Sequence, residues 1–310
     1  MSQSSFGNKF KVTTWGESHG KALGAVIDGC PAGLPLCEED IQKFLDRRKP
    51  GQSRYTTARK EGDLVEILSG VFEGKTTGTP ISLMVRNTDQ RSRDYGNIAY
   101  SYRPGHADYT FDQKYGFRDY RGGGRSSGRE TIGRVAAGAI ASKILEELGI
   151  SICTYTRSIG PVEIASFNKE EIHQNAFYMP DAQAAVKAGE YLEECMKNQD
   201  SAGGVIECRI TGTPAGLGEP VFDKLSALLA HALMSIGAVK AVEIGDGIAV
   251  TSSNGSTDND GFTVKDGEII KTSNHAGGIM GGISDGSEII LRAHICLLYT
   301  SDAADEARSV

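Results

Sequence analysis

Arg121-Gly-Gly-Gly-Arg-Ser-Ser-Gly-Arg-Glu-Thr131 leads directly into a segment with helical periodicity. Its consecutive glycines allow left-handed or closely approached backbone that a Cβ atom would prevent. Ser127 and Glu130 have the spacing of a capping box, which predicts a helix from about Ser127. Gly149 predicts the end of this helix at Leu148. Between these ends, apolar residues recur every three or four positions: Ile132, Val135, Ala136, Ala139, Ile140 and Ile144.

This glycine loop has the chemistry of an anion site. A helix N-terminus offers unpaired N–H groups and a favourable dipole. Arg121, Arg125 and Arg129 add positive charge, and Ser126 and Ser127 add hydroxyl donors. The loop does not match the nucleotide P-loop pattern. The sequence therefore favours a phosphate or polyanion cradle, with a plain tight connection as the alternative.

Composition restricts the class of protein. The chain has 310 residues, of which 39% are hydrophobic and 24% charged, as in a soluble globular protein with a large core. A run of apolar residues long enough to span a membrane and a secretory signal are both absent from the sequence. The six cysteines form no Cys-x-x-Cys pair, which predicts a cytoplasmic protein without a metal site or disulfide framework.

Charge argues against nucleic acid as a partner. The net charge is −7, which disfavours binding to a polyanion over the whole surface. Basic residues nevertheless gather in two segments, residues 43–60 and 118–134. We interpret this concentration as a grip on a small, multiply charged anion. A solvated basic loop remains the alternative for the first segment.

Two histidines stand in glycine-rich bends. His19 lies in Trp15-Gly-Glu-Ser-His-Gly20, and His106 follows Pro-Gly in the aromatic, non-periodic segment 94–120. Loops at strand ends often carry catalytic side chains. Both histidines are therefore candidate site residues, although each could be an ordinary surface or hydrogen-bonded histidine.

The order of the predicted elements indicates an α+β fold. Strand-only stretches come first, and strands and helices then alternate, which favours helices covering or lying between sheets in a single domain. The predicted strands are 9–14, 22–28, 64–68, 81–85, 151–156, 204–210 and 239–244, and the other predicted helices are 38–48, 180–197 and 223–235. A second glycine-rich stretch, Asn274–Gly286, fits a flat phosphate-bearing cofactor approached by backbone on two sides, or a plain array of turns.

Several long motifs, in order along the chain, resemble the chorismate synthase family. They are Gly16-Glu-Ser-His-Gly20, Arg103-Pro-Gly-His-Ala-Asp108, Gly124-Arg-Ser-Ser-Gly-Arg-Glu-Thr131, Ala232-Leu-Met-Ser-Ile-Gly-Ala-Val-Lys240 with Val242-Glu-Ile-Gly-Asp-Gly247, and Asn274-His-Ala-Gly-Gly-Ile279. The resemblance runs from about Gly7 to Ile295. It implies a layered β-α-β sandwich and a cytoplasmic homotetramer. It also implies 1,4-anti elimination of phosphate from 5-enolpyruvylshikimate 3-phosphate with reduced FMN, and NADPH as a candidate reductant.

The resemblance also implies roles for residues. His19 would be the acid for the departing phosphate, and His106 would hold a proton at the flavin. The implied substrate-binding residues are Arg48, Arg54, Arg129 and Arg134, with Arg48 and Arg54 also matching a pyridine-nucleotide contact. The implied cofactor-binding residues are Arg125, Ser126, Ser127, Gly237, Ala238 and Gly278. No metal is implied.

The sequence departs from the family pattern in two places. The family usually has a larger residue where this chain has Gly237. From Cys296 the sequence reads as a non-native tail over 296–310, which predicts a single domain over 1–295 without its C-terminal part. We therefore expect weak FMN binding and little activity.

Two other functions remain open at this point. A flavin-dependent oxidoreductase could use the same loops with net electron transfer to or from NAD(P)H. A nucleic-acid-binding protein could use the Arg-Gly-Gly run, against which the net charge of −7 argues.

Overall fold

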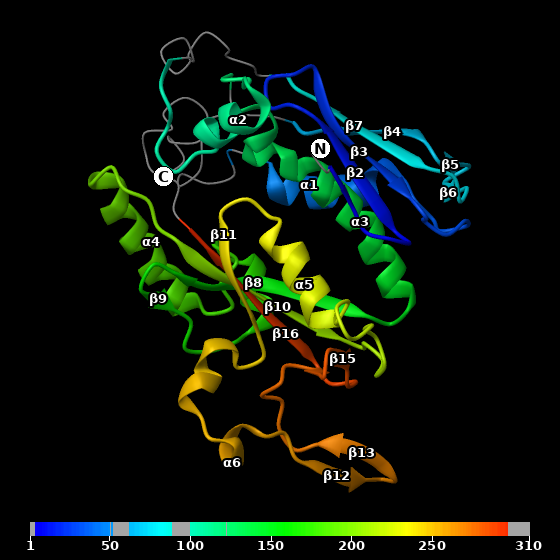
Figure 1. Cartoon of the computed structure of the whole chain (residues 1–310), viewed down its shortest axis with the longest axis vertical. Coiled ribbons are helices and arrows are strands. Elements are labelled where there is room, and N and C mark those ends of the chain that lie inside the picture. The colour runs from blue at the N-terminus through cyan, green and yellow to red at the C-terminus, as the bar shows by residue number, and fades with distance from the viewer. Residues whose placement is uncertain (1–3, 50, 52–61, 89–99, 122, 297–310) are drawn as a thin grey trace. The chain divides into compact units, whose positions relative to one another are not determined.

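The computed structural model describes residues 4–49, 51, 62–88, 100–121 and 123–296 (Figure 1). The chain divides into two compact units, one up to Ile144 and the other from Leu145 onward, apart from residues 199–201, which belong to the first. Both units combine helices with antiparallel sheet, so the predicted α+β class is confirmed. The single domain predicted over residues 1–295 stays a prediction beside this division.

The first unit is built on a five-stranded antiparallel sheet in the order β1-β2-β3-β7-β4. Its strands are β1 (Ser5–Phe6), β2 (Lys11–Gly16), β3 (Ala22–Asp28), β7 (Ile81–Arg86) and β4 (Val65–Ser69), and a small hairpin joins β5 (Val71–Phe72) to β6 (Lys75–Thr76). The bend that carries His19 connects β2 to β3. Because Ala22 pairs with Arg86, the residue that follows β7 lies beside this bend.

Helices α1 (Glu38–Arg48) and α3 (Thr131–Glu147) lie beside this sheet (Figure 1). Alternate residues of the strands and one stripe of each helix form the core, which includes Leu23, Ile27, Ile41, Leu45, Leu83, Ile132 and Ile140. Gly133 allows α3 to approach closely, since an added Cβ would lie 2.9 Å from the backbone oxygen of Gly24 in β3. The unit also contains α2 (Asp108–Tyr115) and two short 3-10 helices, η2 (Gly124–Ser126) and η3 (Gly128–Glu130).

The second unit contains another five-stranded antiparallel sheet, in the order β11-β16-β10-β8-β9. Its strands are β11 (Val239–Ile244), β16 (Ile289–Ile295), β10 (Gly204–Thr211), β8 (Ser151–Ile159) and β9 (Val162–Glu163). Helix α5 (Leu225–Met234) packs on this sheet, and helix α4 (Ala182–Lys197) packs near β9. The remaining elements are η4 (Lys169–His173), η5 (Gly247–Ser252), α6 (Gly255–Asp258) and the hairpins β12 (Phe262–Lys265)–β13 (Glu268–Lys271) and β14 (Ile279–Met280)–β15 (Ile283–Ser284).

The structure differs from the sequence-based prediction at the start of α3. The helix was expected from Ser127, but residues 128–130 form a 3-10 turn and α3 begins at Thr131. Ser127 accepts from the backbone N–H of Arg129, whereas the Glu130 carboxylate accepts from Thr14 and Arg134 at 2.9 Å each. Tertiary contacts thus take the side chain that a capping box would need.

The segment 94–120 was predicted to be a non-periodic loop. Part of it lies outside the described residues, but Asp108–Tyr115 forms helix α2, which ends at left-handed Gly116. Tyr102 and Tyr109 form an edge-to-face pair with ring centroids 5.4 Å apart. This segment is therefore more ordered than its lack of apolar periodicity suggested.

Candidate active site

The glycine loop brings the two histidine-bearing bends together within the first unit. Gly123 and Gly124 have positive φ values of 72° and 56°. A Cβ at Gly123 would lie 3.0 Å from Cε1 and Nε2 of His106. The oxygen of Gly124 accepts a hydrogen bond from the backbone N–H of Ser18 at 3.3 Å. Adjacent glycines therefore contact both bends, and their positive φ values favour glycine at both positions.

His106 belongs to a buried polar group with Arg103 and Asp108. Its Nδ1 lies 2.9 Å from Oδ1 of Asp108, and Arg103 donates to both oxygens of that carboxyl at 2.8 and 2.9 Å. Burial raises the pKa of Asp108, but the hydrogen bonds from Arg103 and the charge of His106 outweigh it and lower the pKa to about 2. Because a carboxylate only accepts, Nδ1 of His106 carries the proton. Nε2 lies on the side of Gly123 and 3.0 Å from Nη2 of Arg103, which can only donate to it.

His19 is buried in the tight bend between β2 and β3, with 6% of its surface exposed. The bend is closed by a hydrogen bond from the N–H of Gly20 to the oxygen of Glu17 at 3.0 Å. Gly16 has a φ of 90°, and a Cβ there would lie 2.2 Å from the oxygen of Ala22. The neighbouring hydroxyl of Ser18 is fully buried and has no hydrogen-bond partner among the described residues.

Two arginines predicted to bind substrate meet at one carboxylate. Nη1 of Arg48 lies 2.8 Å from one oxygen of Asp63, and Nη2 of Arg129 lies 3.1 Å from the other. The Asp63 side chain is fully buried, and that of Arg129 is 6% exposed. Arg129 also donates to Oδ1 of Asn87 through Nε and Nη2. Its Nη1 is buried and has no hydrogen-bond partner in the described part of the chain, which leaves a charged donor for a ligand.

The predicted cofactor-binding side chains of the glycine loop bond to the protein itself. Arg125 donates to the oxygen of Gly16 at 3.2 Å and to Oγ1 of Thr14 at 2.7 Å. Ser126 donates to the oxygen of Gly123 at 2.7 Å, and Ser127 caps η3. These side chains hold the loop in place around His106, so the part of the loop that could contact a flavin is its backbone.

Arg134 and Arg54 complete the predicted substrate contacts. Arg134 forms an ion pair with Glu130 at 2.9 Å on the surface of α3, with 37% of its side chain exposed. Arg54, and the loop around it that was predicted to be an anion clamp, lie outside the described residues.

The remaining predicted cofactor residues lie in the second unit, at opposite ends of β16. The oxygen of Ala238 accepts from the N–H of Cys296, just after the last residue of the strand. A Cβ at Gly278 would lie 3.0 Å from Cα of Ile289, the first residue of the strand. At about 3.3 Å per residue the two sites are about 20 Å apart. An added Cβ at Gly237 meets no described atom within 4 Å, so the larger residue usual in the family would fit there.

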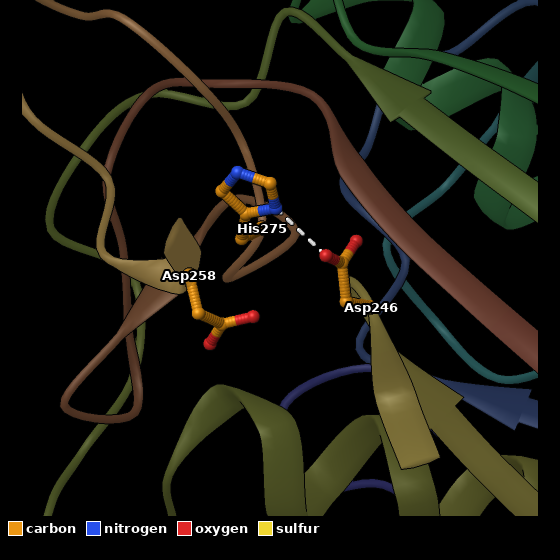
Figure 2. Close-up of side chains that lie close together, drawn as sticks. All are labelled: Asp246, Asp258 and His275. Atoms are coloured by element: carbon orange, nitrogen blue, oxygen red, sulfur yellow. Dashed lines mark hydrogen bonds and ion pairs between the residues drawn. The ribbon is translucent and has the colours of Figure 1, made fainter. Parts of the chain in front are cut away.

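The structure also places Asp246, Asp258 and His275 close together in the second unit (Figure 2). Nδ1 of His275 lies 2.7 Å from Oδ2 of Asp246, and hydrogen bonding to that carboxylate raises the pKa of His275. Both side chains are more than one-third exposed, at 40% for Asp246 and 35% for His275. This ion pair accounts for the approach of His275 and Asp246 but not of Asp258, and we assign no ligand to the three side chains.

Sequence reasoning missed Asp63 and Asn87 as members of the candidate site. Asn87 carried a signal, because it is a polar residue directly after a buried strand, where functional side chains often stand. Asp63 carried none that we recognise, since its two arginine partners come from distant parts of the chain.

Comparisons with known proteins identify the family of the chain. The model of the chorismate synthase family matches residues 10–300, past the predicted end of the resemblance at Ile295, and so does not bear out that end. Chorismate synthases of Agathobacter rectalis and Lachnoclostridium phytofermentans are each 66% identical to the chain, over 95% of it and 81% of the relative.

A solved chorismate synthase structure is also similar. It has a TM-score of 0.79 and 34% sequence identity, and the similarity covers 93% of this chain and 84% of that one. Sequence and fold point the same way: the chain belongs to the chorismate synthase family, lyases that form chorismate by eliminating phosphate.

Proposed function

We propose that the chain forms chorismate from 5-enolpyruvylshikimate 3-phosphate with reduced FMN, and that the cluster around His19, Arg129 and His106 is its active site. The observation that carries the proposal is Arg129, a buried guanidinium near the His19 bend with one nitrogen that no described residue bonds. A substrate with two carboxylates and a phosphate needs such desolvated cationic donors.

The family resemblance suggests the proposed roles, and the contacts of Arg129 and His106 support them. His19 donates a proton to the departing phosphate, whose developing charge must be neutralised. Arg129 and Arg48, with Arg54 and Arg134, bind the anionic groups of the substrate. His106, with Nδ1 bonded to Asp108, holds a proton for exchange with the flavin.

The chain's own residues would hold the flavin through backbone. Gly123 leaves no space between the loop and His106 for a side chain, and Arg125, Ser126 and Ser127 keep the loop in this shape. When bound, reduced FMN supplies transient electron donation that amino-acid side chains lack. Because Ala238 and Gly278 lie at opposite ends of β16, we propose that they contact different flavins or different parts of one; the homotetramer implied by the resemblance stays a prediction.

We also propose that the protein is cytoplasmic. All six cysteines are free thiols, as expected in a reducing cytoplasm. Within the described part of the chain, none of the helices has the length and hydropathy of a membrane span. NADPH as the reductant of FMN remains a prediction, tested by whether it replaces a chemical reductant in the assay.

Anaerobic turnover with reduced FMN tests the function. We expect one phosphate to be released for each chorismate formed while the flavin ends reduced, and losses of about 100-fold or more in His19→Ala and His106→Ala. The wild-type rate in this assay also tests the weak FMN binding and little activity expected from the sequence. Continuous consumption of NADPH with a reduced product would instead establish the flavin-dependent oxidoreductase.

A further inference from the structure

We propose that Asn87 is a positioning residue that fixes the His19 bend relative to Arg129. The inference rests on the roles proposed for these two residues and extends the site to a side chain that acts through them. Three observations support this role: the register of the sheet, the hydrogen bonds of the Asn87 amide, and the ability of an amide to donate at one atom and accept at the other.

The sheet of the first unit brings Asn87 to the bend. Strand β7 ends at Arg86, which pairs with Ala22 at the start of β3. The backbone N–H of Asn87 continues the ladder by donating to the oxygen of Lys21 at 3.2 Å. The side chain of Asn87 therefore starts from a fixed point directly beside residues 17–20.

The amide of Asn87 is fully used. Nδ2 donates to the backbone oxygens of Glu17 at 3.1 Å and Gly20 at 2.8 Å, which stand on either side of His19. Oδ1 accepts from Nη2 of Arg129 at 2.8 Å and from its Nε at 3.2 Å. Carbonyl oxygens only accept and guanidinium groups only donate, so these partners fix the orientation of the amide.

This arrangement sets the spacing between the proposed acid and the proposed anion-binding group. Nδ2 of Asn87 binds the bend that carries His19, and Oδ1 binds Arg129. Nη1 of Arg129 has no bond to a described residue and can donate to an anion. A displacement of about 1 Å at a reacting group can cost about 100-fold in rate. Aspartate has nearly the same shape as asparagine but cannot donate, so it would keep Arg129 and release the bend.

The test compares Asn87→Asp with a matched control, Asn175→Asp. Asn175, in the second unit, also donates from Nδ2 to two backbone oxygens, those of Glu171 at 2.9 Å and Met179 at 2.8 Å. Its Oδ1 also accepts, from backbone N–H groups. The control therefore loses the same two bonds away from the proposed site.

Two measurements on the 310-residue chain are needed: hydrogen–deuterium exchange of the peptide covering residues 16–21, and anaerobic steady-state kinetics with reduced FMN and 5-enolpyruvylshikimate 3-phosphate. In Asn87→Asp we expect at least tenfold faster exchange at the Gly20 amide. We also expect a fall in kcat of about 10- to 100-fold, with KM changed less than about threefold because Arg129 keeps its partner. Asn175→Asp should leave all three unchanged.

A double variant shows whether Asn87 acts through His19. In a His19→Ala background, Asn87→Asp should lower kcat by less than about twofold, since residues that act as a unit are non-additive. Multiplicative losses, or unchanged exchange at residues 17–20 in Asn87→Asp, would overturn the proposal. Faster exchange with wild-type kcat in Asn87→Asp would also overturn the positioning role, whereas wild-type kcat in His19→Ala would refute the acid role of His19, so the two failures can be told apart.

Discussion

Replacing Asp63 with asparagine should destabilise the first unit by about 3 kcal/mol or more. The Asp63 side chain is fully buried and carries the ion pairs to Arg48 at 2.8 Å and Arg129 at 3.1 Å. Breaking a buried pair by removing one partner costs about 3–5 kcal/mol, because the remaining charge stays uncompensated. Arg129 is only 6% exposed and cannot recover hydration, whereas Arg48 is 19% exposed and partly can. This difference places the expected loss towards the lower end of that range.

Urea unfolding followed by tryptophan fluorescence measures the effect. The chain has one tryptophan, Trp15, and it lies in β2 of the first unit. The matched control is Glu66→Gln, which removes a single surface ion pair to Arg86 at 2.7 Å. In that pair the arginine is 66% and the glutamate 43% exposed. Such exposed pairs contribute about 0–1 kcal/mol.

The reasoning predicts a lower midpoint for Asp63→Asn with an unchanged m-value, and nearly wild-type behaviour for Glu66→Gln. Equal shifts in the two variants would refute it, because the buried carboxylate would then contribute no more than a solvated one. A changed m-value would show that the variant alters compactness, and the free energy would no longer report the ion pairs.

Three further predictions concern packing and pH. Gly133→Ala should lower the free energy of unfolding by about 1–3 kcal/mol, since its Cβ would meet a backbone oxygen of β3 at 2.9 Å. Gly138→Ala, at an exposed position of the same helix with no atom within 4 Å, should raise it by up to about 1 kcal/mol in the same urea titration. Burial raises the pKa of Glu207, but hydrogen bonds from Tyr155 and Arg292 lower it to about 2, so its stabilisation is complete above about pH 4.3 and is lost as pH falls through 2. Circular dichroism should therefore show weaker acid dependence in Glu207→Gln. Burial, and then the hydrogen bond to Glu207, raise the pKa of Tyr155 above its usual range. The ultraviolet difference titration between wild type and Tyr155→Phe should therefore show no ionisation near pH 10. The stability that the neutral phenol adds should be lost only as the pH rises above about 10.

The sequence predicted elements well where one periodicity dominates. Helix α1 and strands β3 and β11 have the predicted bounds, and α1 buries one face through Ile41 and Leu45. The start of α3 was wrong because the carboxylate of Glu130 bonds to Thr14, a residue that local spacing cannot reveal. Strand β16 was missed although its alternating buried residues were visible in the sequence.

In the candidate site, too, local patterns were predicted and long-range contacts were not. His19 and His106 were found because glycines flank them or precede them at short range. Asp63 and Asn87 contribute through contacts with Arg129, which is 66 and 42 residues away in the chain. Such partners depend on the pairing of strands and on helix packing, and a sequence window of local motifs does not contain that information.

The position of Asn87 therefore depends on the hydrophobic core. Strands β3 and β7 pair Leu23 with Val85, Ala25 with Leu83 and Ile27 with Ile81, and all six side chains are buried. A shift of one residue would turn this entire set towards the opposite face of the sheet. Five of the six are large aliphatic residues, each worth about 1.5–3 kcal/mol when buried, so the shift would cost about 7–15 kcal/mol. This is comparable to the whole stability of a domain. Apolar burial thus fixes the register of β3 and β7. The register in turn places the Asn87 amide beside the His19 bend, so no interaction within the site is needed to bring them together.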